Sequence, residues 1–378
     1  MATLKQQRIF LGVFFFLSGF CFSSWAARIP SIKANFSYNE AELGTILLTM
    51  PISSLIGLPI SGWLVTKFDS RIPLSVAFIF HAICLTLVGL ANSTFTLVVA
   101  IFVFAFSMRI LNIAMNTQAI TLQKRYDRKI NGSFHGLWST GGIVGVGFTT
   151  VMVAFEMTII PHLIAVSIIT IITVLASYRY LLRDDKSPTG NKLALGKPDP
   201  YIFYLGLLVF FAAVCEGGMF DWSGIYFQQV VEVEIFTAGY LIFMTTMALS
   251  RFFSDKIIGK IGMPATFVNS SLLIFSGVSL AIIFPYFWIA MIGFSLVGLG
   301  TAAVIPMVYT LAGASKKYSP GLAISIVVTF GMVGMLIGPP VIGYIAHAFN
   351  LKISFILFAF SGLMLIPISR LFFKLNKE

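Results

Sequence analysis

The chain has little charge. Only 10% of its 378 residues are Asp, Glu, Lys or Arg, whereas 58% are hydrophobic and the mean hydropathy is +0.94. A soluble globular domain carries about 25% charged residues. The composition therefore excludes an ordinary water-soluble fold and indicates a protein surrounded by lipid. The net charge of +11 does not indicate nucleic-acid binding, because the basic residues form short clusters between apolar runs and no contiguous stripe.

Reactive and metal-binding residue types are also scarce. Cys21, Cys84 and Cys215 each lie inside an apolar run without a neighbouring Cys or His, which predicts small buried side chains. The sequence has no GxxxxGKS/T loop for ATP, and no HExxH, GxSxG or Cys/His cluster that would support enzyme chemistry. We therefore predict no metal, no cofactor and no enzymatic activity.

Long apolar runs fill most of the sequence. A helix needs about 20 apolar residues to cross the hydrocarbon core of a bilayer. The runs predict an all-α membrane protein with an uncleaved first helix. We place its twelve transmembrane helices at 9–29, 41–65, 73–91, 95–121, 134–155, 159–180, 202–226, 236–256, 264–284, 287–312, 322–346 and 352–373.

The distribution of basic residues predicts the orientation of these helices. Most of the 25 Lys and Arg residues fall at the termini or in alternate loops, and the intervening loops hold only Lys33 and Lys352. Lys and Arg are concentrated in cytoplasmic loops of membrane proteins. We therefore predict cytoplasmic N- and C-termini for a multi-pass protein of a bacterial inner membrane.

The longest hydrophilic stretch separates two sets of six spans. We predict an N-terminal six-helix bundle at 1–182, a cytoplasmic linker at 183–199 and a C-terminal six-helix bundle at 200–378. A weak repeat at an offset of about 190 residues supports this division, because residues 124–126 (KRY) match residues 316–318 (KKY). Pseudo-symmetric bundles of this kind place a binding site between the halves and permit alternating access.

Three segments resemble a known family. Residues 62–71 (GWLVTKFDSR) are similar to the G-x-L-x-D-R-x-G-R-R motif of the major facilitator superfamily, with Thr66 in place of the expected Asp. Residues 25–30 (WAARIP) and 216–223 (EGGMFDWS) resemble the MosC-like group of that superfamily. The resemblance implies a secondary active transporter with a central cavity.

Charged residues inside the spans are the first candidates for a site, because Asp, Arg or Lys at a span centre costs about 2.5–3.5 kcal/mol on insertion scales. We predict Glu216 to carry a proton or to bind a cation or hydroxyl of the substrate. A structural hydrogen bond between helices is the alternative. Arg109 is predicted to bind an anionic substrate or to neutralise Glu216. Arg28 and Asp221, near the outer ends of their spans, are predicted to form an outer gate pair or to be unrelated interfacial residues.

Polar and aromatic residues complete the predicted substrate site. Asn116 is predicted to be a polar wall residue. His135 is predicted to relay protons, with a cap or an inner-gate hydrogen bond as the alternative. His81 is predicted to bond between helices. Aromatic rings that could pack against the C–H faces of a sugar or cyclitol are Trp25, Trp138, Trp222 and Tyr226. Anchoring at the membrane interface explains Trp25 and Trp222 equally well.

Charged inner loops are predicted to form the inner gate. Its members are Lys67, Arg71, Arg251 and Asp255. The last two residues are four apart, so they could also pair on one helix.

The expected function is proton-coupled transport of a small polar organic solute, with a sugar or cyclitol as the first guess. Drug or metabolite efflux, a lipid flippase on the same fold, and a transporter-like solute sensor are the alternatives. The expected partners are the solute, protons and the lipid bilayer, with no nucleic acid, and the expected state is a monomer.

Overall fold

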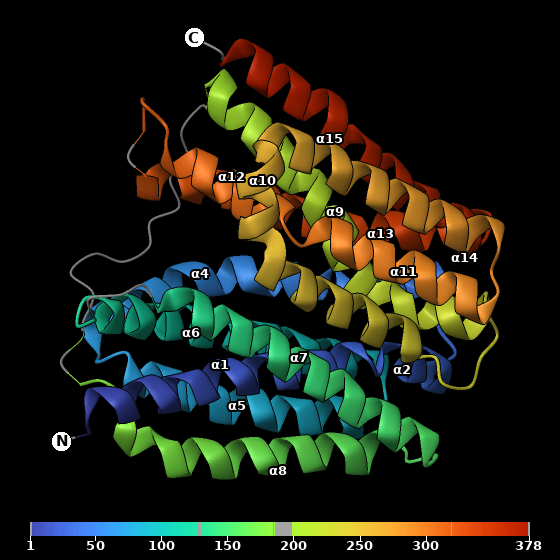
Figure 1. Cartoon of the computed structure of the whole chain (residues 1–378). Coiled ribbons are helices and arrows are strands. Elements are labelled where there is room, and N and C mark those ends of the chain that lie inside the picture. The colour runs from blue at the N-terminus through green and yellow to red at the C-terminus, as the bar shows by residue number, and fades with distance from the viewer. Residues whose placement is uncertain (1, 127–129, 184, 186–198, 319, 377–378) are drawn as a thin grey trace. The chain divides into compact units, whose positions relative to one another are not determined.

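The structure is a computed structural model that describes residues 2–126, 130–183, 185, 199–318 and 320–376 (Figure 1). The side chains of 131, 132, 255, 320–322 and 325 are outside this description. Every regular element in the described residues is a helix. Contacts divide the chain into unit 1, Met1–Phe36 with Thr49–Lys192, and unit 2, Ser37–Leu48 with Leu193–Glu378. Most of the predicted linker, 186–198, lies outside the described residues.

The apolar runs form membrane-length helices. Among the described residues, 11 helical segments are long and apolar enough to cross a bilayer. The 46-residue helix α10 (Ala238–Ile283) leaves helical geometry at Gly262, where φ is 79°, so it consists of two helices. One of the eleven segments, Lys256–Ile283, contains the second helix, and the first helix, which begins at Ala238, corresponds to the remaining predicted span. The predicted all-α membrane fold and the predicted separation of the eighth and ninth spans are confirmed.

Unit 1 is a bundle in which α1 packs along α7, and α5 packs against α6 and α8 (Figure 1). Its helices are α1 (Leu4–Ala26), α2 (Ile29–Phe36), α4 (Thr49–Lys67), α5 (Arg71–Leu90), α6 (Thr94–Gln123), α7 (Asn131–Ala154), α8 (Ile159–Ser177) and the short η1 (Tyr178–Tyr180). Without a hydrophobic driving force between helices in lipid, close van der Waals packing must hold such a bundle together.

Glycines make the contact between α1 and α7 possible. A Cβ atom on Gly141 would overlap the Phe16 carbonyl oxygen, and one on Gly19 would overlap the Trp138 carbonyl oxygen. The backbones can therefore approach only because these positions lack side chains.

Unit 2 is built around α9, which packs against α13 and α15 (Figure 1). These three helices are α9 (Pro200–Gln229), α13 (Pro320–Ala348) and α15 (Ile356–Leu375). The other helices of unit 2 are α3 (Glu40–Leu47), α10, α11 (Phe287–Thr301), α12 (Val304–Gly313) and α14 (Leu351–Ser354). The span that contains Glu216 and Asp221 therefore lies at the centre of this unit.

The short helix α3 belongs to unit 2 although it precedes α4 of unit 1 in the chain. It packs on α13, where a Cβ on Gly44 would lie 2.9 Å from the Pro339 carbonyl oxygen, and the Thr45 and Tyr344 hydroxyls are 3.1 Å apart. These residues precede the predicted division at 183–199, which stays a prediction, and their contacts group them with unit 2. Close packing onto α13 outweighs chain continuity.

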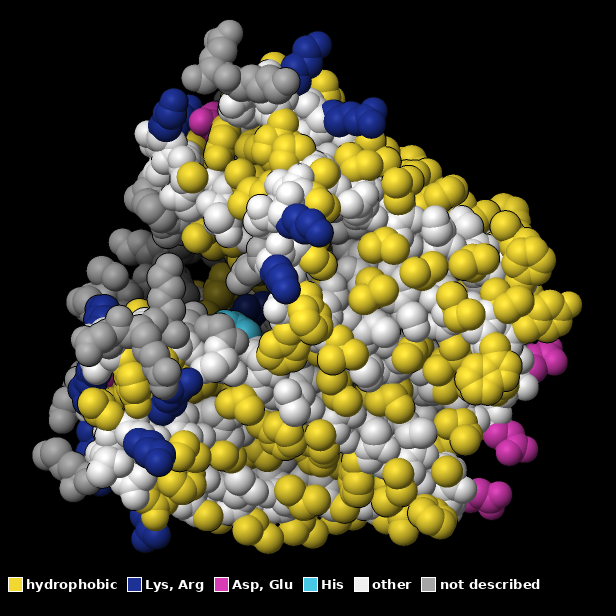
Figure 2. All heavy atoms as spheres, in the orientation of Figure 1, with side chains coloured by type: hydrophobic (Ala, Val, Ile, Leu, Met, Phe, Trp, Pro, Cys, Tyr) yellow, Lys and Arg dark blue, Asp and Glu magenta, His cyan; other side chains and the backbone are white. Residues whose placement is uncertain are grey.

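Apolar side chains cover the middle of the helices on the face shown in Figure 2, and charged side chains gather near the helix ends. Large rings are strongly exposed, including Phe95 at 77% and Trp288 at 74%. This distribution matches a surface in contact with hydrocarbon, because charged groups at helix ends can reach the headgroup region.

Candidate functional site

An ion pair inside unit 2 joins two long helices. Arg251 Nη2 of α10 lies 3.0 Å from Glu216 Oε1 of α9, and the two side chains are 30% and 10% exposed, respectively. The other carboxylate oxygen, Oε2, is buried without a hydrogen-bond partner among the described residues. A carboxylate has about four acceptor sites, so this one retains unused capacity for a proton or a ligand donor.

Helix geometry places this pair far from both ends of its helices. Glu216 is sixteen residues after Pro200 and thirteen before Gln229, or about 24 and 20 Å along the axis. Arg251 is thirteen residues after Ala238 and eleven before Gly262, or about 20 and 16 Å. With a hydrocarbon core about 30 Å thick, the Glu216 carboxylate lies too far from either end of α9 to reach a headgroup region easily. Arg251 therefore supplies a cationic partner inside the unit.

Arg251 and Asp255 lie within the predicted span 236–256, and α10 continues through both positions to the break at Gly262. Arg251 pairs with Glu216 of α9, and its part in an inner gate stays a prediction. The side chain of Asp255 lies outside the description, so its part in an inner gate stays a prediction.

The neighbours of Glu216 are tightly packed. A Cβ on Gly218 would overlap the Phe358 ring, and one on Gly217 would lie 3.4 Å from Met335 Cγ. Tyr309 of α12 is close enough to interact electrostatically with the carboxylate. These contacts fix the rotation of α9 and hence the direction of the Glu216 side chain.

The aromatic residues predicted in the same helix have structural contacts. Trp222 and Tyr226 have no exposed surface, and the Tyr226 hydroxyl donates a hydrogen bond to the Ala281 carbonyl oxygen at 2.8 Å. The Tyr226 ring also lies 4.3 Å from that of Phe355. Both rings therefore pack within unit 2 in this conformation. Asp221 is half-buried and lies five residues beyond Glu216 on α9.

Unit 1 contains a charged residue in the middle of α6 without a partner of its own. Arg109 is half-buried, its Nε is inaccessible, and no described residue of unit 1 hydrogen-bonds or ion-pairs with it. Its stem packs near Gly57 of α4, where an added Cβ would lie 3.3 Å from Arg109 Cβ. Asn116, two turns along, donates to its own helix at the Asn112 carbonyl oxygen, 2.8 Å away.

Arg28 is bound inside unit 1 by a residue that the sequence analysis missed. Its Nε donates to His162 Nδ1 at 3.2 Å, and its Nη2 donates to the Met157 carbonyl oxygen at 2.8 Å. Because Nδ1 must accept, the His162 ring is neutral and its Nε2 faces the Thr149 hydroxyl, 3.3 Å away. No local signal in the sequence marks His162, which lies 134 residues from Arg28. An outer gate pair with Asp221 stays a prediction.

The remaining predicted residues of unit 1 differ in exposure. Trp25 is 1% exposed, and its ring centroid lies 5.9 Å from that of Phe104. Trp138 is half-buried and His135 is exposed, so these two retain accessible surface for a solute or proton. His81 Nδ1 of α5 lies 3.1 Å from the Phe104 carbonyl oxygen of α6, which confirms its predicted interhelical bond.

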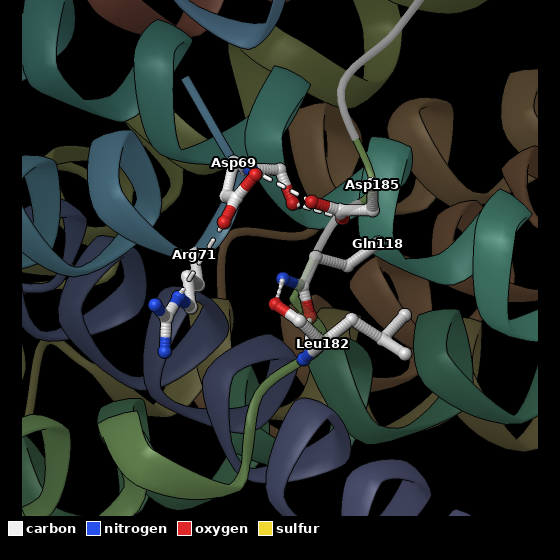
Figure 3. Close-up of polar contacts among 6 residues, drawn as sticks. Asp69, Arg71, Gln118, Leu182 and Asp185 are labelled. Carbon is white, nitrogen blue, oxygen red and sulfur yellow. Dashed lines mark hydrogen bonds and ion pairs between the residues drawn. The ribbon is translucent and has the colours of Figure 1, made fainter.

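The loop between α4 and α5 is fastened to the segment after η1 (Figure 3). The carboxylate of Asp185 accepts hydrogen bonds from the Ser70 backbone N–H, at 2.9 Å, and from the Ser70 hydroxyl. Gln118 of α6 donates to the Leu182 carbonyl oxygen at 3.2 Å and accepts from the Leu182 N–H at 3.1 Å. Burial raises the pKa of the Asp185 carboxyl above its ordinary value, against the opposing effect of the Ser70 bonds.

The predicted inner-gate cations of unit 1 lie beside this loop. Arg71 Nε is 4.0 Å from Asp69 Oδ2, and a dashed line marks this ion pair in Figure 3. The Arg71 guanidinium lies over the Tyr178 ring at 5.4 Å. The Lys67 ammonium lies 4.8 Å from the Trp63 ring centroid. Cation–π contacts of this kind position both cations at the end of their helices. No group of three or more His, Cys, Asp or Glu in the described part of the chain could hold a metal ion.

Comparisons with known proteins agree with this architecture. The family model of the Major Facilitator Superfamily matches residues 10–317. An uncharacterized MFS-type transporter of Yersinia pestis is 32% identical over 352 residues, covering 93% of this chain and 91% of the relative. The membrane protein MosC of Rhizobium meliloti is 30% identical over 344 residues, with 89% and 83% covered. The chain therefore belongs to the Major Facilitator Superfamily and is a membrane transporter, not an enzyme.

Two solved structures show the same fold. The nucleoside transporter NupG superposes with a TM-score of 0.75 at 15% identity, covering 97% of this chain and 99% of that one. A bacterial homolog of the human lysosomal transporter Spinster, inward-facing and occupied, superposes with a TM-score of 0.77 at 16% identity, covering 97% and 96%. At these identities the likeness concerns the fold alone.

Proposed function

We propose that this transporter is a proton-coupled carrier of a small polar organic solute and that Glu216 carries the proton. The ion pair between Glu216 and Arg251, near the middle of two membrane-length helices, is the observation that carries this proposal. A low-dielectric environment disfavours an isolated charge, so a carboxylate there either keeps a cationic partner or takes up a proton.

The pair couples protonation to the packing of two helices. When Glu216 is ionised, it holds Arg251 through a charge-assisted hydrogen bond between α9 and α10. A proton on the carboxylate removes this attraction and weakens the link between the two helices. The 30% exposure of Arg251 gives its guanidinium access to water or to a solute oxygen. One proton can thus shift the balance between two arrangements of the bundle.

Arg109 is the proposed solute anchor in unit 1. A half-buried guanidinium without an acceptor in its own unit is costly, so its acceptor must come from outside that unit. A hydroxyl-rich or anionic solute would provide one, and a sugar or cyclitol stays the first guess. Trp138 and His135 are proposed to add contacts, because both retain accessible surface. Arg28 with Asp221 stays proposed as the outer gate.

The proposal is tested with purified protein in proteoliposomes. A thermal-stabilisation screen over sugars, cyclitols, amines and organic acids at two pH values first identifies a ligand. Uptake of that ligand is then measured with an imposed pH gradient and, separately, as counterflow without a gradient. Glu216→Gln should abolish gradient-driven accumulation while leaving counterflow within about threefold, because only the net movement of protons requires the carboxylate.

A matched variant controls for loss of one negative charge. Glu234→Gln changes an exposed acid in the loop between α9 and α10 and should leave both modes intact. Full gradient-driven uptake by Glu216→Gln would refute the proton-carrier role. Arg109→Gln should weaken ligand binding by about tenfold or more, since a hydrogen bond to a charged group contributes about 1.5–3 kcal/mol; unchanged affinity would remove Arg109 from the solute site.

A further inference from the structure

A groove on unit 2 lies where α15 ends and the second helix of α10 begins. Its volume is about 340 Å³, within the range of small-ligand sites. Pro264, Ala265 and Val268 of α10 form one wall, and Phe373 of α15 forms the other. The kink at Gly262, with φ of 79°, sets the direction of the α10 wall. The groove is therefore formed by the start of the second helix of α10 and the end of α15.

The groove is apolar along its walls and positively charged at its rim. Arg370 and Lys374 lie one turn apart on α15, are both exposed, and have no hydrogen bond or ion pair with a described residue of unit 2. None of the seven described lining residues is acidic. Two unneutralised cations at the rim of apolar walls are complementary to a ligand with an anionic head and an apolar body.

The position of the groove selects one kind of ligand. Lys374 is next to Leu375, the last residue of α15, and Arg370 is one turn earlier, so both lie at the depth where a spanning helix meets the headgroups. The positive-inside bias predicts that this end is cytoplasmic. We propose that the groove binds one anionic phospholipid of the cytoplasmic leaflet, with its phosphate between Arg370 and Lys374 and an acyl chain along Ala265 and Val268.

This site is distinct from the one proposed for transport. The groove contains neither Glu216 nor Arg251, and its lining comes from the start of the second helix of α10 and from the end of α15. Its occupancy can therefore be measured without any transported solute. A bound lipid would hold the end of α15 against α10, where the Phe267 and Phe373 ring centroids are already 6.2 Å apart.

Native mass spectrometry and thermal unfolding of the full chain test the proposal. The probes are phosphatidylglycerol and phosphatidylcholine with identical acyl chains, each added to delipidated protein in detergent. Phosphatidylglycerol should be retained and should raise the unfolding temperature, whereas phosphatidylcholine should do neither. Arg370→Gln with Lys374→Gln should weaken phosphatidylglycerol binding by about thirtyfold, because each cation near an anionic lipid surface contributes about fivefold.

Two further variants separate the groove from general surface charge. Lys124→Gln with Arg125→Gln removes two exposed cations at the end of α6 and should leave phosphatidylglycerol binding unchanged. Ala265→Trp fills the groove from its α10 wall while keeping both rim cations, and should abolish binding. Equal retention of phosphatidylcholine, equal loss in the α6 variant, or undiminished binding in either groove variant would each overturn the proposal.

Discussion

Removing either partner of the Glu216–Arg251 pair should reveal how much the pair stabilises unit 2. A charge-assisted hydrogen bond contributes about 1.5–3 kcal/mol net, and breaking a buried ion pair by deleting one partner costs about 3–5 kcal/mol. The 3.0 Å distance places this pair at full contact, but the 30% exposure of Arg251 lets water compensate part of its loss. We therefore expect unequal costs for the two single variants.

The inequality follows from which charge is left behind. Glu216→Gln leaves a partly exposed guanidinium and should lower the free energy of unfolding by about 1–2 kcal/mol. Arg251→Gln leaves a carboxylate that is only 10% exposed and should cost about 3 kcal/mol at neutral pH. The double variant removes both charges, so it should cost less than the sum by about 1–2 kcal/mol.

Equilibrium unfolding of all four proteins in mixed micelles, titrated with a denaturing detergent, measures these free energies. Arg251→Lys is a useful control because it keeps the charge but loses the planar fork, and it should recover part of the loss. If the two single-variant costs simply add, within about 0.5 kcal/mol, then the two side chains do not interact and the pair cannot couple protonation to helix packing.

Two predictions concern unit 1. The raised pKa of Asp185 means that its contribution to folding is present below the ordinary value of 3.8 and is lost as the pH rises through the raised value. Asp185→Asn should therefore raise the melting temperature relative to the native protein more at about pH 7 than at about pH 4; an equal shift at both would contradict this reasoning. Gly141→Ala should cost about 1–3 kcal/mol, because its Cβ would overlap the Phe16 carbonyl oxygen. Gly147→Ala, where a Cβ meets nothing within 4 Å, is the control and should cost almost nothing; equal losses by unfolding measurements would show that α1 and α7 do not pack as described.

Much of the fold could be predicted because the relevant signal is local. A run of about 20 apolar residues must span the bilayer as a helix, since backbone polar groups have no other partner in hydrocarbon. The helical break at Gly262 likewise lies between two predicted spans. The pairing of charges could not be predicted, because it depends on helix rotation. Arg251 lies within a predicted span, but nothing local indicates that it pairs with Glu216, 35 residues away on another helix.

The amino-acid sequence by itself determined the all-helical membrane class, the spans and the family, because hydropathy over one helix length and short motifs are sufficient for these. Tertiary structure decided which polar groups meet: Asp185 with Ser70, Arg28 with His162, and Glu216 with Arg251. These partners lie on different elements, and the packing that brings them together depends on contacts spread over whole helices. The sequence shows that a charge inside a membrane needs a partner, but the partner depends on how the helices pack.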